Sequence, residues 1–256
     1  MRATKAIFKK QMKATAANPE SLIQFMIYPL LALALNALMN QENMMASFAD
    51  LPMPQYVLNQ LANDIARGMP NMITMQATIF AGMGLIPVVA AIIADDIERK
   101  SLRFLSMAGV KPREYLIGVG GVVLFLSFFS SLGFSLVGSF FGVDLLIFMG
   151  AMMSAVAGSI VLGATIGILS SGVQTAAGLS MPLAIVLGFG PLFAQMNERI
   201  ARIYHIFYTQ QLNVIADYLN TGTSDTPLWQ SFAIIWANIA VCGILFAIVY
   251  RKKGIN

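Results

Sequence analysis

The stretch LLIFMGAMMSAVAGSIVLGATIGILSSGVQTAAGLSMPLAIVLGFGPLFAQMN, residues 145–197, contains no Asp, Glu, Lys or Arg. A charged side chain at the centre of a bilayer costs roughly 2.5–3.5 kcal/mol on insertion scales, so membrane-spanning segments exclude it. Because a spanning helix needs about 20 apolar residues, this stretch fits two helices. The turn between them is expected at 170–174, where Ser, Gly and Gln cluster.

Four other stretches lack these charged residues, and each is long enough for one span: 21–41, 68–94, 115–143 and 226–250. The sequence therefore predicts an all-α membrane protein with six transmembrane helices in a single domain, 1–256. Only 11% of the residues are charged, against about 25% in a soluble protein, so no separate soluble domain is expected. The expected spans are about 21–39, 71–94, 115–139, 145–169, 175–196 and 228–250.

The basic residues lie mostly on one side of this six-span topology. Of the 16 Lys and Arg residues, 13 fall in the two termini or in 95–114, whereas the other side holds Arg67, Arg199 and Arg202. Positive charge is retained on the cytoplasmic side, so both termini are expected in the cytoplasm of a cell, which we expect to be bacterial. The net charge of +4 thus reflects membrane topology, and no nucleic-acid partner is expected.

The segments outside the spans also have helical patterns. Residues 2–17 predict an amphipathic helix at the membrane surface, with its cations among lipid headgroups. An ordinary charged N-terminus is the alternative interpretation. Short helices at the outer leaflet are expected within 40–70 and 197–228, where apolar residues recur at helical spacing. The basic stripe of the N-terminal helix consists of Arg2, Lys5, Lys9 and Lys13.

Glycines at four-residue spacing indicate where helices pack closely. Gly163 and Gly167 form a G-x-x-x-G pattern within the predicted fourth span. Such rows allow two helix backbones to approach in a membrane. The pattern fits packing inside one chain or a seam between two copies, and the first interpretation is favoured.

The residues needed for intramembrane catalysis or ion coupling are missing from the predicted spans. The spans contain no charged residue, and His205, the sole histidine, lies outside them. A single cysteine, Cys242, allows neither a disulfide nor a metal cluster within one chain. The phosphate-binding pattern G-x-x-x-x-G-K-[ST] is also missing. We therefore expect a protein that is not an enzyme, has no cofactor or metal of its own, and receives energy from a partner.

The charged segment 95–113 is the best candidate for a cytosolic attachment point. Asp95 with Arg99, and Asp96 with Lys100, are acid-before-base pairs at four-residue spacing, which favour a helix. Gly109 and a following proline predict its end. Apolar side chains on this helix could dock in a partner's groove, although a solvated hairpin is the alternative. These side chains are Leu102, Phe104, Leu105 and Met107.

The same segment carries a resemblance to a known family. The run Glu98-Arg99-Lys100-Ser101-Leu102-Arg103-Phe104-Leu105 resembles the pattern E-[RK]-x-G-[ST]-L-x-x-L of type-2 ABC exporter permeases, and Tyr115-Leu116-Ile117-Gly118 resembles their Y-[LI]-x-[GA]-K run. Ser101 replaces the glycine–threonine step, and Val119 replaces the lysine. A basic amphipathic N-terminal helix, six spans and Pro182 within the fifth span match the family's order of features.

This resemblance implies the permease subunit of an ATP-binding-cassette exporter. A second permease copy, identical or a close paralogue, and ATPase subunits with a Walker A motif would be its partners, with ATP and Mg²⁺ bound on the ATPase. The cargo would be hydrophobic or amphipathic, such as a peptide, drug or lipid. A polysaccharide-exporting permease and a non-transporting immunity or assembly factor are the alternatives. The implied ATPase-coupling residues are Asp95, Asp96, Glu98, Arg99, Lys100, Leu102, Arg103, Phe104 and Leu105.

The resemblance also implies a transport pathway between two permeases, lined by the first, second and fifth spans. Methionine and phenylalanine are frequent there, and a flexible apolar lining suits a hydrophobic cargo. The alternative is that these side chains face lipid. The expected lining residues are Phe25, Met26, Met72, Met75, Phe80, Met83 and Phe189.

Overall fold

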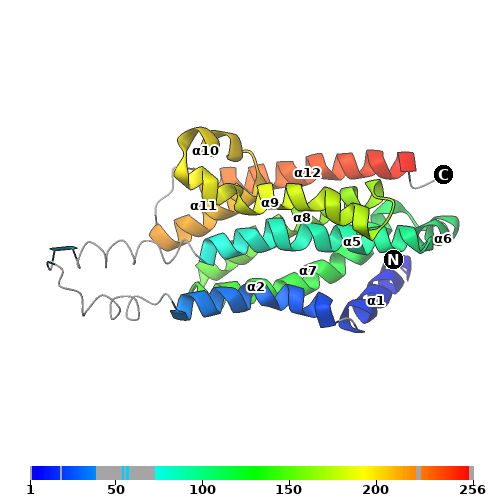
Figure 1. The fold of residues 1–256 in the computed structure, drawn as a ribbon, viewed down its shortest axis with the longest axis horizontal. Coiled ribbons are helices and arrows are strands. Elements are labelled where there is room, and N and C mark those ends of the chain that lie inside the picture. Colours follow the sequence, from blue (N-terminus) through cyan, green and yellow to red (C-terminus); the bar gives the residue numbers. More distant parts are fainter. Residues whose placement is uncertain are drawn as a thin grey trace.

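The computed structural model describes residues 2–17, 19–38, 54, 56–57, 73–222 and 226–253, and this part of the chain is almost entirely helical, with no strand. Figure 1 shows long helices running side by side, with short helices at either end. The long helices are α2 (Pro19–Leu38), the helix Ile73–Glu98 that ends in α5 (Leu85–Glu98), α7 (Pro112–Val137), α8 (Val143–Leu169), α9 (Val173–Met196) and α12 (Leu228–Lys253). The shorter ones are α1 (Arg2–Ala17), α6 (Ser101–Met107), α10 (Glu198–Tyr204) and α11 (Tyr208–Thr221).

Five helices of the described chain are long and apolar enough to cross a membrane by themselves. A sixth span results if α1 and α2, which meet at a bend of 66°, are counted together. The bend lies between the end of α1 at Ala17 and the first turn of α2, close to where the sequence predicts a break between the amphipathic helix and the first span. The all-helical architecture, with five or six helices able to cross a membrane, is therefore confirmed, whereas the count of six and the surface position of α1 remain predictions.

The second span contains a π-helical turn, η1 (Phe80–Gly84), between helical residues 73–79 and α5. A π turn frees a backbone carbonyl from the regular ladder, and here Ser159 of α8 donates a hydrogen bond of 2.5 Å to the carbonyl oxygen of Ala81. The hydroxyl of Tyr208, at the start of α11, lies 2.9 Å from Ser159 Oγ. These polar contacts are buried and join three helices inside the bundle.

The centre of the bundle is α8, which packs against α5, α7 and α12. A Cβ on Gly163 would lie 2.7 Å from the carbonyl oxygen of Ile86, and one on Gly167 would lie 2.8 Å from that of Ala90. Both distances are too short for a side chain. The G-x-x-x-G pattern therefore marks a contact between α8 and α5 within one chain, and the interpretation as internal packing is confirmed.

Two short helices, α10 and α11, follow α9 in the predicted outer segment 197–228. The second packs against α8, α9 and α12 and buries Leu212 and Ile215 completely, so it is part of the bundle core. It ends at Gly222, whose φ of +73° suits glycine. The helix predicted within 40–70 lies outside the described residues, apart from Pro54, Tyr56 and Val57.

The start of α1 and the end of α12 lie at one end of the bundle, together with α6, whereas α10 lies toward the other end (Figure 1). This arrangement fits an even number of crossings. Which end faces the cytoplasm remains a prediction from the distribution of Lys and Arg.

Candidate functional site

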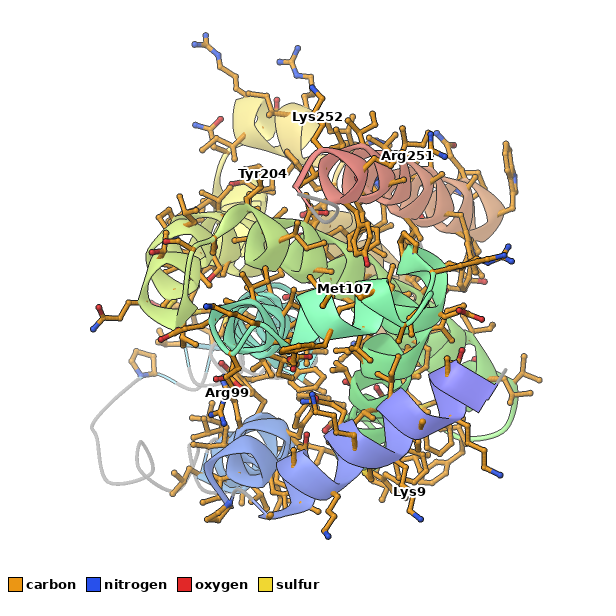
Figure 2. All side chains as sticks on the ribbon, turned by 90° about the vertical axis from the view of Figure 1, so that its right-hand side faces the viewer. Lys9, Arg99, Met107, Tyr204, Arg251 and Lys252 are labelled. Carbon is orange, nitrogen blue, oxygen red and sulfur yellow. The ribbon has the colours of Figure 1, made fainter. Side chains whose placement is uncertain are left out.

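The segment between α5 and α7 forms the short helix α6 at the end of the bundle that carries the chain termini (Figure 2). It is separated from α5 by a sharp turn, in which Lys100 has a φ of +58°. After α6, Gly109 has a φ of +78° and Pro112 is the first residue of α7. A left-handed glycine ends a helix and a proline starts the next one, so the local sequence explains why α6 is short.

The apolar side chains of α6 point in two directions. Leu102 is buried, and Leu105 is partly buried and packs against the core. Phe104 and Met107 are 66% and 67% exposed. The four residues expected to project together thus divide into a pair that attaches α6 to the bundle and a pair that is open to a partner. The side chain of Arg103 lies outside the described part.

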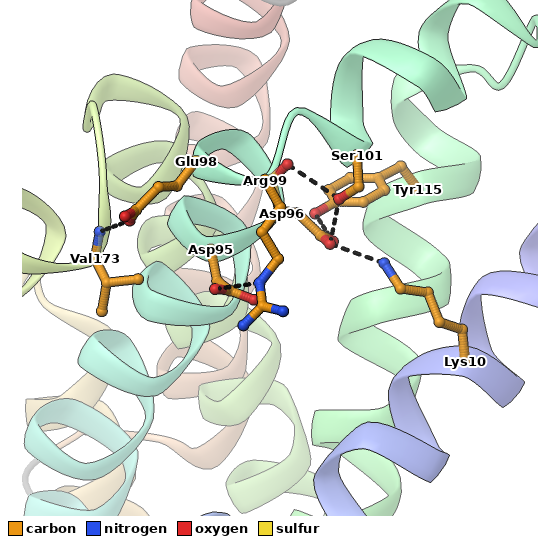
Figure 3. Close-up of polar contacts among 8 residues, drawn as sticks. All are labelled: Lys10, Asp95, Asp96, Glu98, Arg99, Ser101, Tyr115 and Val173. Atoms are coloured by element: carbon orange, nitrogen blue, oxygen red, sulfur yellow. Dashed lines mark hydrogen bonds and ion pairs between the residues drawn. The ribbon is translucent and has the colours of Figure 1, made fainter.

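Asp96, near the end of α5, is the polar centre of this region (Figure 3). Its Oδ1 accepts hydrogen bonds from Lys10 Nζ at 2.8 Å and from Ser101 Oγ at 2.6 Å. Its Oδ2 accepts one from the hydroxyl of Tyr115 at 2.8 Å. The carboxylate thereby connects α5 with α1, α6 and α7. Hydrogen bonds to a charged acceptor are about twice as strong as neutral ones, so this junction fixes the position of α6.

The expected pairing of Asp96 with Lys100 is wrong in the described structure. The α5 helix ends at Glu98, and Lys100 turns away with a positive φ, so the two residues are not on one helix face. Lys10 takes its place. The sequence does indicate a separate role for Lys10, because it is the one basic residue of 2–17 that does not belong to the basic stripe.

The other predicted pair is present, because Arg99 Nε donates to Asp95 Oδ1 at 2.8 Å. Glu98 has a partner that the sequence did not indicate. Its Oε2 accepts a hydrogen bond of 3.2 Å from the backbone N–H of Val173, the first residue of α9. A Cβ on Gly172 would lie 2.9 Å from the same oxygen, so a larger residue at this position would displace the Glu98 carboxylate. A carboxylate at a helix N-terminus also interacts favourably with the helix dipole.

The basic stripe of α1 lies on its outer side. Lys5, Lys9 and Lys13 are exposed, and Figure 2 shows Lys9 pointing away from the bundle. On the opposite face, Ile7 is buried against Gly118 of α7. This division between a packed apolar face and an exposed basic face is the one expected of a helix at a membrane surface. The side chain of Arg2 is outside the described part.

The expected pathway residues do not form one surface. Phe25 and Phe80 are buried in the core of the single chain, so their rings do not face its outside. Met75, Met83 and Phe189 are partly buried, and Met72 lies outside the described residues. Met26 is half exposed and lines a shallow apolar groove between α2 and α7.

The described residues contain no group of three or more His, Cys, Asp or Glu side chains that could hold a metal ion. The chain matches no model of a known protein family, and no curated protein sequence is significantly similar to it. The best candidate for a functional site is therefore the region around α6, where a charged network meets two exposed apolar side chains.

Proposed function

We propose that this chain is the permease subunit of an ATP-binding-cassette exporter, with α6 as the helix that receives the movement of a separate ATPase. The observation that carries the proposal is the way α6 is attached. One face packs on the bundle through Leu102, and the other presents Phe104 and Met107. A helix that is anchored on one side and open on the other suits a docking element.

The charged network supports a role in transmission. Asp96 connects α6 with α1 and α7, and Glu98 connects the end of α5 with the start of α9. A displacement of α6 would therefore reach four helices through hydrogen bonds and short segments of chain. Coupling through a contiguous polar network is one of the physical routes by which a docking event can move distant elements.

The proposal includes a second permease copy and two ATPase subunits that bind Mg²⁺ and ATP. We propose a hydrophobic or amphipathic cargo. The half-exposed Met26 and the apolar groove between α2 and α7 support this choice, because a flexible apolar lining adapts to such molecules. A non-transporting membrane protein that docks a cytosolic partner would use the same exposed face of α6.

Capture of the ATPase tests the docking role of α6. The full chain is expressed together with a candidate Walker A ATPase from a neighbouring reading frame, and the complex is purified through a tag on the permease. Burying the ring of Phe104 in a partner contributes roughly 1.5–3 kcal/mol, so Phe104→Ala should weaken binding about 10- to 150-fold. Phe141→Ala is the control, because that ring is equally exposed (64%) but follows α7 at the other end of the bundle.

Three outcomes of this experiment separate the possibilities. Reduced capture with Phe104→Ala, together with substrate-stimulated ATP hydrolysis by the parent complex, supports the exporter. Unchanged capture refutes docking through α6. Capture of a partner without any substrate-stimulated hydrolysis favours the non-transporting factor.

A second variant tests transmission separately from docking. Glu98→Ala removes the acceptor of the Val173 N–H but leaves the exposed face of α6 intact. We expect normal membrane insertion and ATPase capture, with transport lost or uncoupled from hydrolysis. Glu198→Ala, an exposed carboxylate in α10, is the control. Full transport by Glu98→Ala would refute a coupling role for Glu98.

A further inference from the structure

A cavity of about 480 Å³ lies between α1, the last turns of α5 and the start of α9. One part of its wall is charged and consists of Lys10, Asp95, Asp96 and Arg99. Another part is apolar and includes Ala91 and Ile92, which belong to the final apolar turns of the second span. The cavity thus joins the end of a membrane-spanning helix to a charged rim.

The two cations of the rim have unused hydrogen-bonding capacity. Arg99 uses Nε for Asp95, and among the described residues its two terminal nitrogens meet no partner (Figure 3). Its side chain is 74% exposed. Lys10 donates one hydrogen bond to Asp96 and is 54% exposed, so further N–H groups are available. A guanidinium fork and an ammonium at one rim are suited to bind a phosphate group.

The carboxylates determine which kind of phosphate compound fits. Asp95 and Asp96 balance Lys10 and Arg99, so the formal charge of the rim is zero. Asp96 is buried and both of its carboxylate oxygens accept hydrogen bonds, whereas Asp95 is partly exposed and only its Oδ1 accepts a bond from Arg99. An occupant that brings one negative and one positive group leaves this balance unchanged.

The depth of the cavity points to a lipid. Ala91 and Ile92 lie at the end of an apolar helix, and Lys10 of α1 lines the same cavity. Basic amphipathic helices lie at the level of lipid headgroups. The glycerol region of a phospholipid would contact the apolar wall while its headgroup reaches the charged rim.

We propose that this cavity binds a zwitterionic phospholipid whose headgroup carries a primary ammonium. The phosphate is bound by Arg99 and Lys10, and the ammonium donates to the carboxylate of Asp95. A choline headgroup has no N–H to donate, and an anionic headgroup brings no ammonium to Oδ2 of Asp95, because Arg99 occupies only Oδ1. The site goes beyond the proposed exporter function and does not depend on it, because it needs only a membrane-embedded chain.

Native mass spectrometry of the purified full chain tests the site. The detergent-solubilised protein is titrated with phosphatidylethanolamine, phosphatidylcholine and phosphatidylglycerol that carry identical acyl chains. We expect one tightly retained phosphatidylethanolamine. Arg99→Gln and Asp95→Asn should each weaken it about tenfold or more, the effect of losing one hydrogen bond to a charged group. Arg251→Gln is the control, because Arg251 is exposed at the same end but away from the cavity (Figure 2).

The other results would overturn the proposal. Equal retention of phosphatidylcholine shows that the ammonium hydrogen bonds are not used. Tighter retention of phosphatidylglycerol, strengthened by Asp95→Asn, shows an anion site. Displacement of the lipid by inorganic phosphate shows that free phosphate is the ligand. An equal loss with Arg251→Gln shows that the effect is one of overall charge.

Discussion

Removing the hydroxyl of Tyr115 isolates one hydrogen bond of the Asp96 junction. The side chain is 1% exposed, and Tyr115→Phe keeps its ring contacts while deleting the donor to Asp96 Oδ2. A hydrogen bond to a charged group contributes about 1.5–3 kcal/mol, and Lys10 and Ser101 remain to satisfy the carboxylate. At 2–4 °C per kcal/mol, the melting temperature should fall by about 3–12 °C.

The assay is thermal unfolding of the purified full chain in detergent, followed by the loss of monodisperse protein. Tyr250→Phe is the control, because Tyr250 is also buried but its hydroxyl makes no hydrogen bond among the described residues. Its melting temperature should stay close to that of the parent. In an Asp96→Asn background, Tyr115→Phe should lower the free energy of unfolding by less than it does in the parent. The interaction energy between the two substitutions should be about 0.5–3 kcal/mol. Equal effects of the two Tyr variants, or strict additivity with Asp96→Asn, would refute the junction.

Three further predictions concern packing, pH and topology. Gly167→Ala places a Cβ 2.8 Å from a carbonyl oxygen of α5 and should lower the free energy of unfolding by about 1–3 kcal/mol. Gly178→Ala places its Cβ in open space and should have the melting temperature of the parent. Burial raises the pKa of Asp217, so the charged carboxylate destabilises the fold at pH values above its unfolded pKa of about 3.9. Asp217→Asn should therefore raise the melting temperature at pH 7, and the increase should disappear toward pH 4. An increase that does not depend on pH would contradict burial of the charge as the cause. In a cysteine-free chain, an impermeant reagent should label Arg202→Cys in intact cells but not Met107→Cys, and reversed labelling would invert the topology.

The spans were predictable because lipid excludes charge along whole stretches of sequence. The predicted 145–169 and 175–196 agree with α8 (Val143–Leu169) and α9 (Val173–Met196) within about two residues. Asp95 with Arg99 was also predictable, since both are local to one helix turn. Such features depend on the solvent around a segment or on neighbours four residues away.

The contacts of the candidate site depend on distant residues, and a single sequence does not specify them. Asp96 meets Lys10 from 86 positions away, and Glu98 meets Val173 from 75 positions away. Hydropathy reports that a residue avoids water but not whether it faces lipid or protein. For this reason Phe80, expected in a pathway, is found in the core.

The π-helical turn at Phe80–Gly84 also changes which side chains of the second span share a face. A π turn accommodates one extra residue, and one residue corresponds to about 100° of rotation around an α-helix. Residues 73–79 are therefore rotated by about 100° relative to α5 when compared with an uninterrupted helix. A helical wheel drawn through the whole span assigns Met75 to the wrong side relative to α5. A substitution scan of this span has to be interpreted in two registers, one before Phe80 and one after Gly84.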